Sequence, residues 1–184
     1  MTASISTCNR TRWPTTPASP WLDGPARRIP RHVAHLPAED RPMHITPYLN
    51  FEGTCRAAFA HYQHVLGGEQ RLMTYAQIPP EPDAEGATDA SAADLVMHVT
   101  LAGTNGPLLM GSDLAPGKQL QRTNAISVAL NFDDNLEAER VYAALADGGQ
   151  VQMPIAETFW AERFGVCTDR FGVQWLVNGR YRSP

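Results

Sequence analysis

Cysteine is scarce in this chain, and the few cysteines present form no recognisable pattern. Cys8, Cys55 and Cys167 are scattered over 184 residues without a CxxC spacing. An odd, dispersed set argues against a disulfide framework and against a structural zinc site. We therefore expect reduced thiols and a cytoplasmic protein.

Long apolar runs and a strong charge of one sign are also missing. No stretch approaches the length of a membrane span, and Arg27-Arg28 is followed by Ile-Pro-Arg-His rather than by the apolar core of a signal peptide. The net charge of −4 gives no reason to expect nucleic acid or an anionic membrane as a partner. The sequence thus favours a protein that binds neither nucleic acid nor membrane.

Residues 1–42 differ in composition from the rest of the chain. They hold seven prolines, and six arginines against three acidic residues, a net charge of +3 that leaves −7 for the remainder. Proline at this density is incompatible with a helix or a central strand, and the apolar residues show no period. We predict a disordered Pro/Arg-rich extension over 1–42, with an ordered arm as the alternative, and one globular domain over 43–184.

The stretch from Glu157 to Asn178 predicts two strands joined by a tight turn. It is rich in aromatic and β-branched residues, which suit a pleated, half-buried surface. Between the two strands, the residues from Asp169 to Gly172 have turn chemistry, because Asp bonds its own backbone two residues on and Gly takes a positive φ. We interpret Asp169 as the structural residue of this turn.

The domain also contains a repeat. Leu49-Asn50-Phe51 recurs as Leu130-Asn131-Phe132, and each copy is followed by a helical pattern that ends at a glycine pair at the same distance. Each copy predicts one strand, one helix and three further strands. A single such unit cannot bury both faces of its sheet. The predicted fold class is therefore α+β, with two βαβββ modules forming a curved mixed sheet, a central cavity and the helices outside.

This paired βαβββ layout resembles the PhnB-like branch of the vicinal oxygen chelate superfamily, which contains glyoxalase I, bleomycin-resistance proteins and extradiol dioxygenases. The resemblance implies a homodimer with a small-molecule ligand in the sheet cavity. Members of this branch are often labelled demethylubiquinone methyltransferases, but no glycine-rich nucleotide loop follows a strand and opens a helix here. The motifs that carry the resemblance are Pro47–Gly53, Met97-His98, Leu109–Asp113, Thr158–Trp160 and Thr168–Asn178.

The superfamily's enzymes use a divalent metal as a Lewis acid, held by His and Glu side chains from the first and last strands of each module. Among the matching positions of this chain, only Asp113 is a good ligand for a hard metal. The resemblance therefore implies a degenerate metal site with Asp113 and His98 as weak candidates, and a divalent metal as cofactor stays open. The matching positions fall near Thr46, Ser112 or Asp113, Ser127 and Leu176.

Four residues are candidates for lining the ligand cavity, namely His98, Asp113, Glu157 and Trp160. His98 lies mid-strand, where it either faces the cavity as a ligand or base or makes a hydrogen bond within the sheet. Trp160 either forms the floor of a pocket for an aromatic ligand or packs in the core. Glu157 is either an acid or base or a solvated carboxylate at a strand end. Catalytic residues are not identified by the sequence.

Three functions remain open at this point. The first is binding of a small molecule in the sheet cavity, and the loss of the metal ligands favours it. The second is a metal-dependent isomerase, lyase or dioxygenase acting on a vicinal-oxygen substrate. The third is a structural or regulatory dimer without a ligand, which would be favoured if Trp160, Phe164 and Trp175 filled the cavity.

Overall fold

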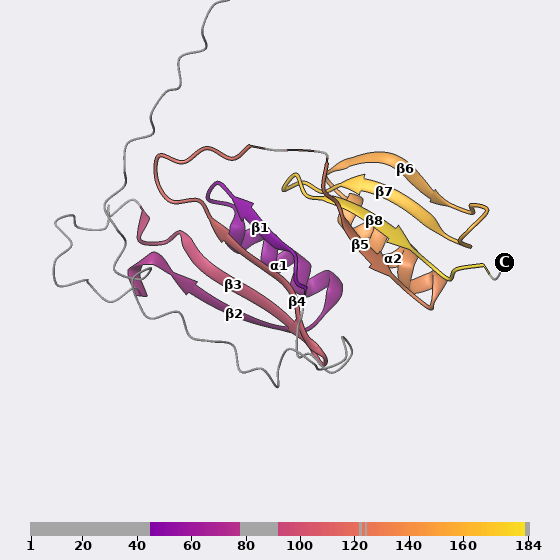
Figure 1. Ribbon diagram of the computed structural model, residues 1–184, viewed down its shortest axis with the longest axis horizontal. Helices are drawn as coiled ribbons and strands as arrows, with labels where there is room; N and C mark the ends of the chain where they lie inside the picture. The colour runs from indigo at the N-terminus through magenta and orange to yellow at the C-terminus, as the bar shows by residue number, and fades with distance from the viewer. Residues whose placement is uncertain (1–44, 78–91, 122, 124, 183–184) are drawn as a thin grey trace, which may run out of the picture. The chain divides into compact units, whose positions relative to one another are not determined.

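Two successive segments of the chain each fold into one helix and four strands (Figure 1). The structure is a computed structural model that describes residues 45–77, 92–121, 123 and 125–182. The extension predicted over 1–42 lies outside the described residues. The first module consists of β1 (Tyr48–Phe51), α1 (Cys55–Leu66), β2 (Glu69–Thr74), the short 3₁₀ turn η3 (Tyr75–Gln77), β3 (Val96–Gly103) and β4 (Gly106–Asp113).

The second module repeats this order without the 3₁₀ turn. It consists of β5 (Val128–Asn131), α2 (Asn135–Ala146), β6 (Gln150–Ala156), β7 (Phe164–Thr168) and β8 (Gln174–Asn178). The strand orders are β1-β4-β3-β2 and β5-β8-β7-β6, so corresponding strands occupy corresponding positions. In each sheet the first strand is parallel to the last, and the other pairs are antiparallel. The predicted α+β class with two βαβββ modules is confirmed.

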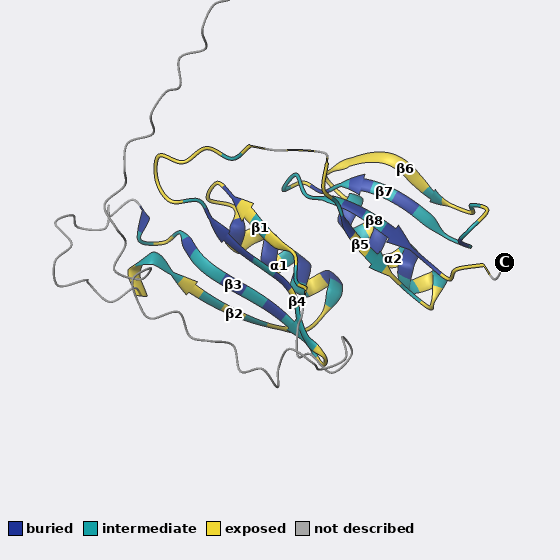
Figure 2. Ribbon diagram, viewed as in Figure 1, coloured by how far each residue is buried: buried dark blue, intermediate teal, exposed yellow. Residues whose placement is uncertain are grey.

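Each helix covers one face of its own sheet. In β3 the buried Val99 and Leu101 alternate with the half-buried His98 and Thr100, as expected when one face of a strand meets a helix. Trp175 and Val177 of β8 are likewise fully buried. Figure 2 shows the buried positions concentrated on the helices and the inner strands of both sheets. The opposite face of each sheet, which we call the open face, carries no described helix.

Polar and aromatic contacts join the two modules. The Tyr62 hydroxyl of α1 donates to Asp169 Oδ2 at 2.6 Å, and the Tyr62 ring packs edge-on against Trp175 with ring centroids 5.3 Å apart. Arg140 of α2 donates to the carbonyl oxygen of Val65 at 2.8 Å. The buried apolar residues of both modules therefore form one core cluster. Among the described helices, none has the length and hydropathy that a membrane crossing requires.

The two helices begin in different ways. Asp134 precedes α2, and its side chain accepts the backbone N–H of Leu136 at 3.0 Å, a regular N-cap. Thr54 precedes α1 but makes no side-chain cap. The first N–H of α1, from Cys55, instead donates to Asp113 at the end of β4.

One glycine in each sheet allows an aromatic ring of the helix to approach the strand. A Cβ on Gly111 of β4 would lie 2.6 Å from the Phe59 ring and 2.7 Å from the Leu49 carbonyl oxygen. A Cβ on Gly165 of β7 would lie 2.6 Å from the Tyr142 ring. The absence of a side chain at these two positions sets the helix-to-sheet distance.

The first of the two strands predicted from Glu157 onward starts later than expected. Residues 157–163 form an irregular connection, and β7 begins at Phe164. The physical reason is local, because the Thr158 N–H donates to the Ala161 carbonyl while the Thr158 hydroxyl accepts the Ala161 N–H at 3.1 Å. Such short-range bonds compete with a strand ladder.

Candidate functional site

The open face of the first sheet carries a group of hydrogen-bonded polar side chains centred on His98. His98 Nδ1 lies 3.3 Å from the Tyr48 hydroxyl, and Nε2 lies 3.1 Å from the Thr100 hydroxyl. The Tyr48 and His98 rings are stacked, with centroids 5.8 Å apart and an interplanar angle of 29°. His98 thus lies on the face of β3 opposite to the buried Val99.

Strands β1 and β4 add two more polar groups beside the histidine. The Ser112 hydroxyl donates to Asn50 Oδ1 at 3.4 Å, and these two residues are register partners. The pairing of Val99 with Gly111 places Ser112 next to His98 across the β3–β4 ladder. We call Tyr48, Asn50, His98, Thr100 and Ser112 the His98 cluster.

The hydrogen bonds of the cluster couple the tautomer of His98 to the orientation of the two hydroxyl groups. A neutral imidazole has one donor and one acceptor nitrogen. If Tyr48 donates to Nδ1, then Nε2–H donates to Thr100, and the reverse arrangement requires both hydroxyls to turn. Tyr48 is 47% exposed, so its phenol is accessible. The cluster can therefore present either a donor or an acceptor to a bound oxygen atom.

A cavity of about 260 Å³ adjoins the His98 cluster. Tyr48 and Asn50 belong to both the cluster and the cavity wall. From the second module, Gln174 lines the cavity, and its Oε1 accepts the Ser127 hydroxyl at 2.9 Å. Ile126, which is 76% exposed, adds apolar surface at the rim. Polar groups converging on a partly apolar cavity are the usual composition of a small-molecule site.

Asp113, the strongest metal candidate in the sequence, lies on the helix side of the sheet. Its side chain is 2% exposed, and its two oxygens accept the backbone N–H groups of Cys55 at 3.0 Å and Val96 at 2.9 Å. These bonds give the carboxylate a structural task, which is to tie the start of α1 to β3. The geometry therefore does not bring Asp113 to the His98 cluster.

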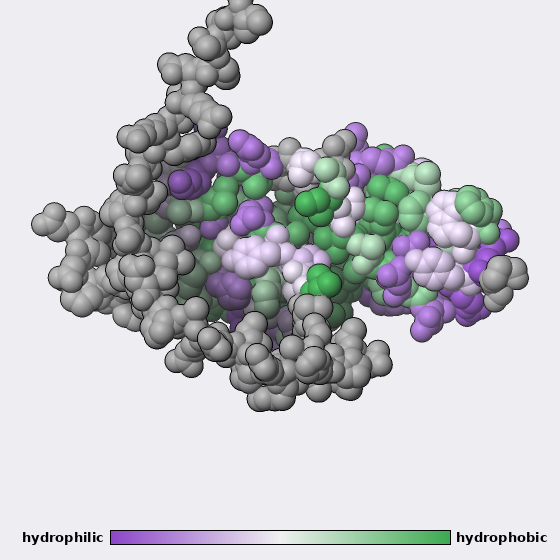
Figure 3. Space-filling model, viewed as in Figure 1, coloured by the Kyte–Doolittle hydropathy of each residue, from purple (hydrophilic) through white to green (hydrophobic). Residues whose placement is uncertain are grey.

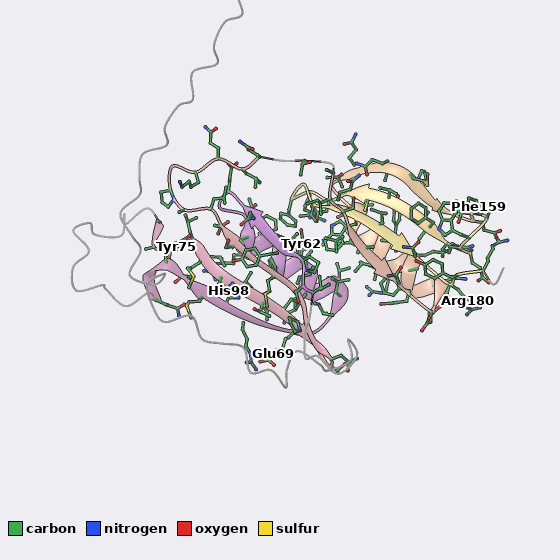
Figure 4. The ribbon with its side chains drawn as sticks, viewed as in Figure 1. Tyr62, Glu69, Tyr75, His98, Phe159 and Arg180 are labelled. Carbon is green, nitrogen blue, oxygen red and sulfur yellow. The ribbon has the colours of Figure 1, made fainter. Side chains whose placement is uncertain are left out.

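Glu157 and Trp160 lie in the second module, in the connection before β7. Glu157 is exposed and pairs with Arg182 at 2.6 Å and with Arg163 at 3.7 Å. Trp160 is half-buried and packs edge-on against Phe164, with ring centroids 5.2 Å apart. Figure 4 shows His98 and Phe159, the neighbour of Trp160, on different modules. Within one chain, the four predicted residues are thus not brought together.

The divalent metal implied by the superfamily does not fit the residues present. No group of three or more His, Cys, Asp or Glu side chains that could hold an ion occurs among the described residues. Ser127 donates to Gln174, Ser112 donates to Asn50, and Leu176 has no donor atom. We therefore derive no chemical step through a metal.

The two described cysteines are not nucleophiles. Cys55 and Cys167 are unpaired and fully buried. Burial, with a smaller contribution from nearby Asp113, raises the pKa of Cys55 from 9.0 to about 12. Burial and then Asp169 raise the pKa of Cys167 to about 11. Both thiols are protonated at neutral pH and therefore unreactive.

Comparison with known proteins identifies the family. The family model described as 3-demethylubiquinone-9 3-methyltransferase matches residues 43–178. The chain belongs to this PhnB-like family. Protein YjdN of Escherichia coli (strain K12) is 33% identical over 149 residues, which cover 77% of this chain and 99% of YjdN. The resemblance of the sequence to PhnB-like proteins is confirmed.

Solved structures show the same PhnB-like fold. Protein PA1353 from Pseudomonas aeruginosa is 42% identical, with a TM-score of 0.65, over 75% of this chain and 98% of that protein. A putative 3-demethylubiquinone-9 3-methyltransferase, PhnB protein, from Bacillus cereus is 22% identical, with a TM-score of 0.57, over 74% and 99%. The second similarity concerns the fold alone.

Sequence reasoning found the centre of the His98 cluster but not most of its members. Tyr48 and Asn50 alternate within the motif Pro47–Gly53, and that alternation places both on one face of β1. Thr100 lies two residues after His98 on the same face. These period-two patterns were the signal in the sequence that could have identified Tyr48, Asn50 and Thr100 as members of the cluster. The pairing of β1 with β4, which brings Tyr48 towards β3, is a long-range property that the pattern does not contain.

Proposed function

We propose that this PhnB-like protein binds a small molecule at the His98 cluster, without a metal. The observation that carries the proposal is the hydrogen-bonded arrangement of Tyr48, His98 and Thr100 beside a cavity of about 260 Å³. A ligand with two neighbouring oxygens suits this surface, because Tyr48 and Asn50 offer polar groups on the same edge of the cavity. The unpaired, buried cysteines support a cytoplasmic location.

Two alternatives receive less support. The metal-dependent enzyme lacks a donor set among the described residues. The ligand-free dimer would be favoured if Trp160, Phe164 and Trp175 filled the cavity, and none of them is among the residues that line it. The family's descriptive name is that of a methyltransferase, which would need a bound methyl donor, and the sequence contains no glycine-rich nucleotide loop.

Catechol is a suitable first probe, because it is small, aromatic and carries two neighbouring hydroxyls. We expect catechol to bind and to perturb the backbone amide resonances of β1, β3 and β4. His98→Ala should weaken binding by about tenfold and Tyr48→Phe by about three- to tenfold, the range for loss of one or two hydrogen bonds. Calorimetric titration under anaerobic conditions measures the catechol affinity of the wild type and of both variants.

His64→Ala is the matched control for that titration. His64 is an exposed histidine on α1, outside the cluster, so its replacement should leave the affinity unchanged. Equal affinity of the wild type and the His98→Ala variant would overturn the proposed site. Absence of catechol binding in all of them would overturn catechol-like ligands for this cavity.

We further propose that the protein is a homodimer whose open faces are covered by a second copy, so that a ligand at the His98 cluster lies between the two copies. Large apolar side chains are exposed on the open faces, including Met73 at 45%, Leu108 at 43% and Met153 at 44%. Figure 3 shows apolar residues, interspersed with polar ones, on the face of both modules seen in this view. Large exposed apolar side chains on both open faces favour an interface there.

Replacement of Met153 by arginine tests the dimer. We expect the wild type to sediment as a dimer and Met153→Arg as a monomer, since a charge on a covered face is costly. Leu136→Arg is the control, because Leu136 is a 76% exposed apolar residue on α2 rather than on an open face. Analytical ultracentrifugation reads the mass directly. A monomeric wild type would contradict the proposal.

A further inference from the structure

The open face of the second sheet carries a row of side chains that corresponds to the centre of the His98 cluster. Asn178 of β8 is the register partner of Asn131 on β5 and of Phe164 on β7, and β8 lies between these two strands (Figure 1). We call these three residues the Asn178 row. Because the two modules share one strand order, the row has a counterpart in the first sheet. That counterpart consists of Asn50, Ser112 and His98.

Asn178 is the buried member of this row, and its side chain lies on the open face. It follows Val177, which is fully buried on the helix side, and successive side chains of a strand point to opposite faces. Asn178 is only 6% exposed, although no described helix covers the open face. The neighbouring side chains on that face must therefore cover most of it.

The carboxamide of Asn178 is without a partner in the chain. The backbone carbonyl of Asn178 accepts the Phe132 N–H at 2.9 Å, but its carboxamide makes no hydrogen bond to any part of the chain that the structure describes. The carboxamide of Asn131, by contrast, accepts the Tyr181 hydroxyl at 2.9 Å. Buried polar groups are normally paired, because an unpaired one costs free energy. A bound molecule with a matching donor and acceptor would remove this cost.

Aromatic side chains stand on both sides of Asn178. On the β5 side, the Tyr181 hydroxyl reaches the neighbouring Asn131. On the β7 side, Phe164 is the direct neighbour, and the half-buried Trp160 packs edge-on against it with ring centroids 5.2 Å apart. Aromatic side chains offer large apolar contact area to a planar molecule. The surroundings of the carboxamide therefore suit a flat ring.

We propose that the Asn178 row is a second binding site, which takes a neutral aromatic amide or lactam. Such a group carries an N–H donor beside a carbonyl acceptor, and the carboxamide of Asn178 offers the complementary pair. Asparagine makes the same two-bond contact with the donor and acceptor edge of adenine.

The charge of the row and its location complete the proposal. The row continues to Ala156 on β6, and its four side chains are uncharged, which favours a neutral ligand over an ion. The site goes beyond the proposed function and does not depend on it, because none of its residues belongs to the His98 cluster. In the proposed dimer, a ligand there would also lie between the two copies.

Benzamide is the first probe, because it is a flat ring with one primary amide. It is titrated into the full-length protein, and we expect the side-chain NH₂ resonances of Asn178 and the indole N–H resonance of Trp160 to shift. N,N-dimethylbenzamide keeps the ring and the carbonyl but has no N–H donor, so it should bind about tenfold more weakly. Equal affinity for the two compounds would overturn the amide pairing. Absence of benzamide binding would overturn the site.

Asn178→Ser tests the location of the site. Serine is the residue that the first sheet has at the corresponding position, so the fold should tolerate it. We expect this variant to bind benzamide about tenfold more weakly than the wild type and to lose the preference for benzamide over N,N-dimethylbenzamide.

Two control variants accompany Asn178→Ser. Asn105→Ser changes an exposed asparagine in the turn between β3 and β4, and His98→Ala removes the centre of the His98 cluster. Both should bind benzamide like the wild type. Wild-type affinity in Asn178→Ser, or loss of benzamide binding in His98→Ala, would overturn the assignment of the ligand to the Asn178 row.

Discussion

Replacement of Asp169 by alanine is expected to cost the protein about 4 kcal/mol or more of unfolding free energy, among the largest effects of a single substitution. Asp169 is 4% exposed, and its carboxylate accepts four hydrogen bonds. Oδ1 accepts the backbone N–H groups of Phe171 and Val173, each at 2.9 Å. Oδ2 accepts the Tyr62 hydroxyl at 2.6 Å and Trp175 Nε1–H at 2.8 Å.

The size of this effect follows from the burial of the donors. Removal of the carboxylate leaves the indole N–H of the fully buried Trp175 and two half-buried backbone N–H groups without this acceptor, and each unsatisfied buried group costs roughly 1–3 kcal/mol. Asp169→Asn should have an intermediate effect, because an amide keeps one acceptor oxygen but places an NH₂ group against two donors.

Urea unfolding followed by tryptophan fluorescence measures both variants. Arg170→Ala is the matched control at the neighbouring position, where an exposed side chain pairs with Asp147, and it should change the unfolding free energy by no more than about 1 kcal/mol. An Asp169→Ala variant as stable as the Arg170→Ala control would show that the four hydrogen bonds contribute little.

Replacement of Gly111 by alanine is the second large effect, expected at about 3 kcal/mol of destabilisation. The added Cβ would lie 2.6 Å from the Phe59 ring and 2.7 Å from the Leu49 carbonyl oxygen. Phe59 is fully buried, and Leu49 belongs to the paired strand β1. Neither neighbour can move freely, so the clash separates α1 from the sheet.

Gly103→Ala is the matched control for Gly111. The nearest atoms to its added Cβ would be those of the Leu108 side chain, at 3.3–3.4 Å, a flexible side chain that has to move by only a few tenths of an ångström. Combining Gly111→Ala with Phe59→Leu should recover part of the loss, which a double-mutant cycle by urea unfolding quantifies. Full additivity of the two substitutions would contradict steric contact as the cause.

The fold was predictable from local signals that the chain repeats. The Leu-Asn-Phe tripeptides and the glycine pairs mark the same points in both modules, and the observed strand orders correspond strand for strand. The turn beginning at Asp169 was predicted from its residues. That Asp169 also accepts from Tyr62, 107 residues earlier, was not, because a turn motif carries no information about a distant helix.

The site was predictable only in part, for a similar reason. Alternation along β3 identifies His98 as a residue that faces away from the buried Val99, but it does not identify Tyr48 as its partner. Asp113 was a reasonable metal candidate by residue type. Its burial against two backbone N–H groups depends on how β4 meets the start of α1, and sequence spacing does not reveal that.

The unequal start of the two helices has a consequence for the order in which the modules fold. Asp134 caps α2 from the residue directly before it, so the start of this helix depends on no distant part of the chain. The first N–H of α1 depends on Asp113, 58 residues further along the chain, and closing so long a loop carries an entropic cost before the bond can form. The two modules share one topology, yet α2 gains its N-terminal hydrogen bond locally. The corresponding bond of α1 forms only when β4, the last strand of the first module, is in place.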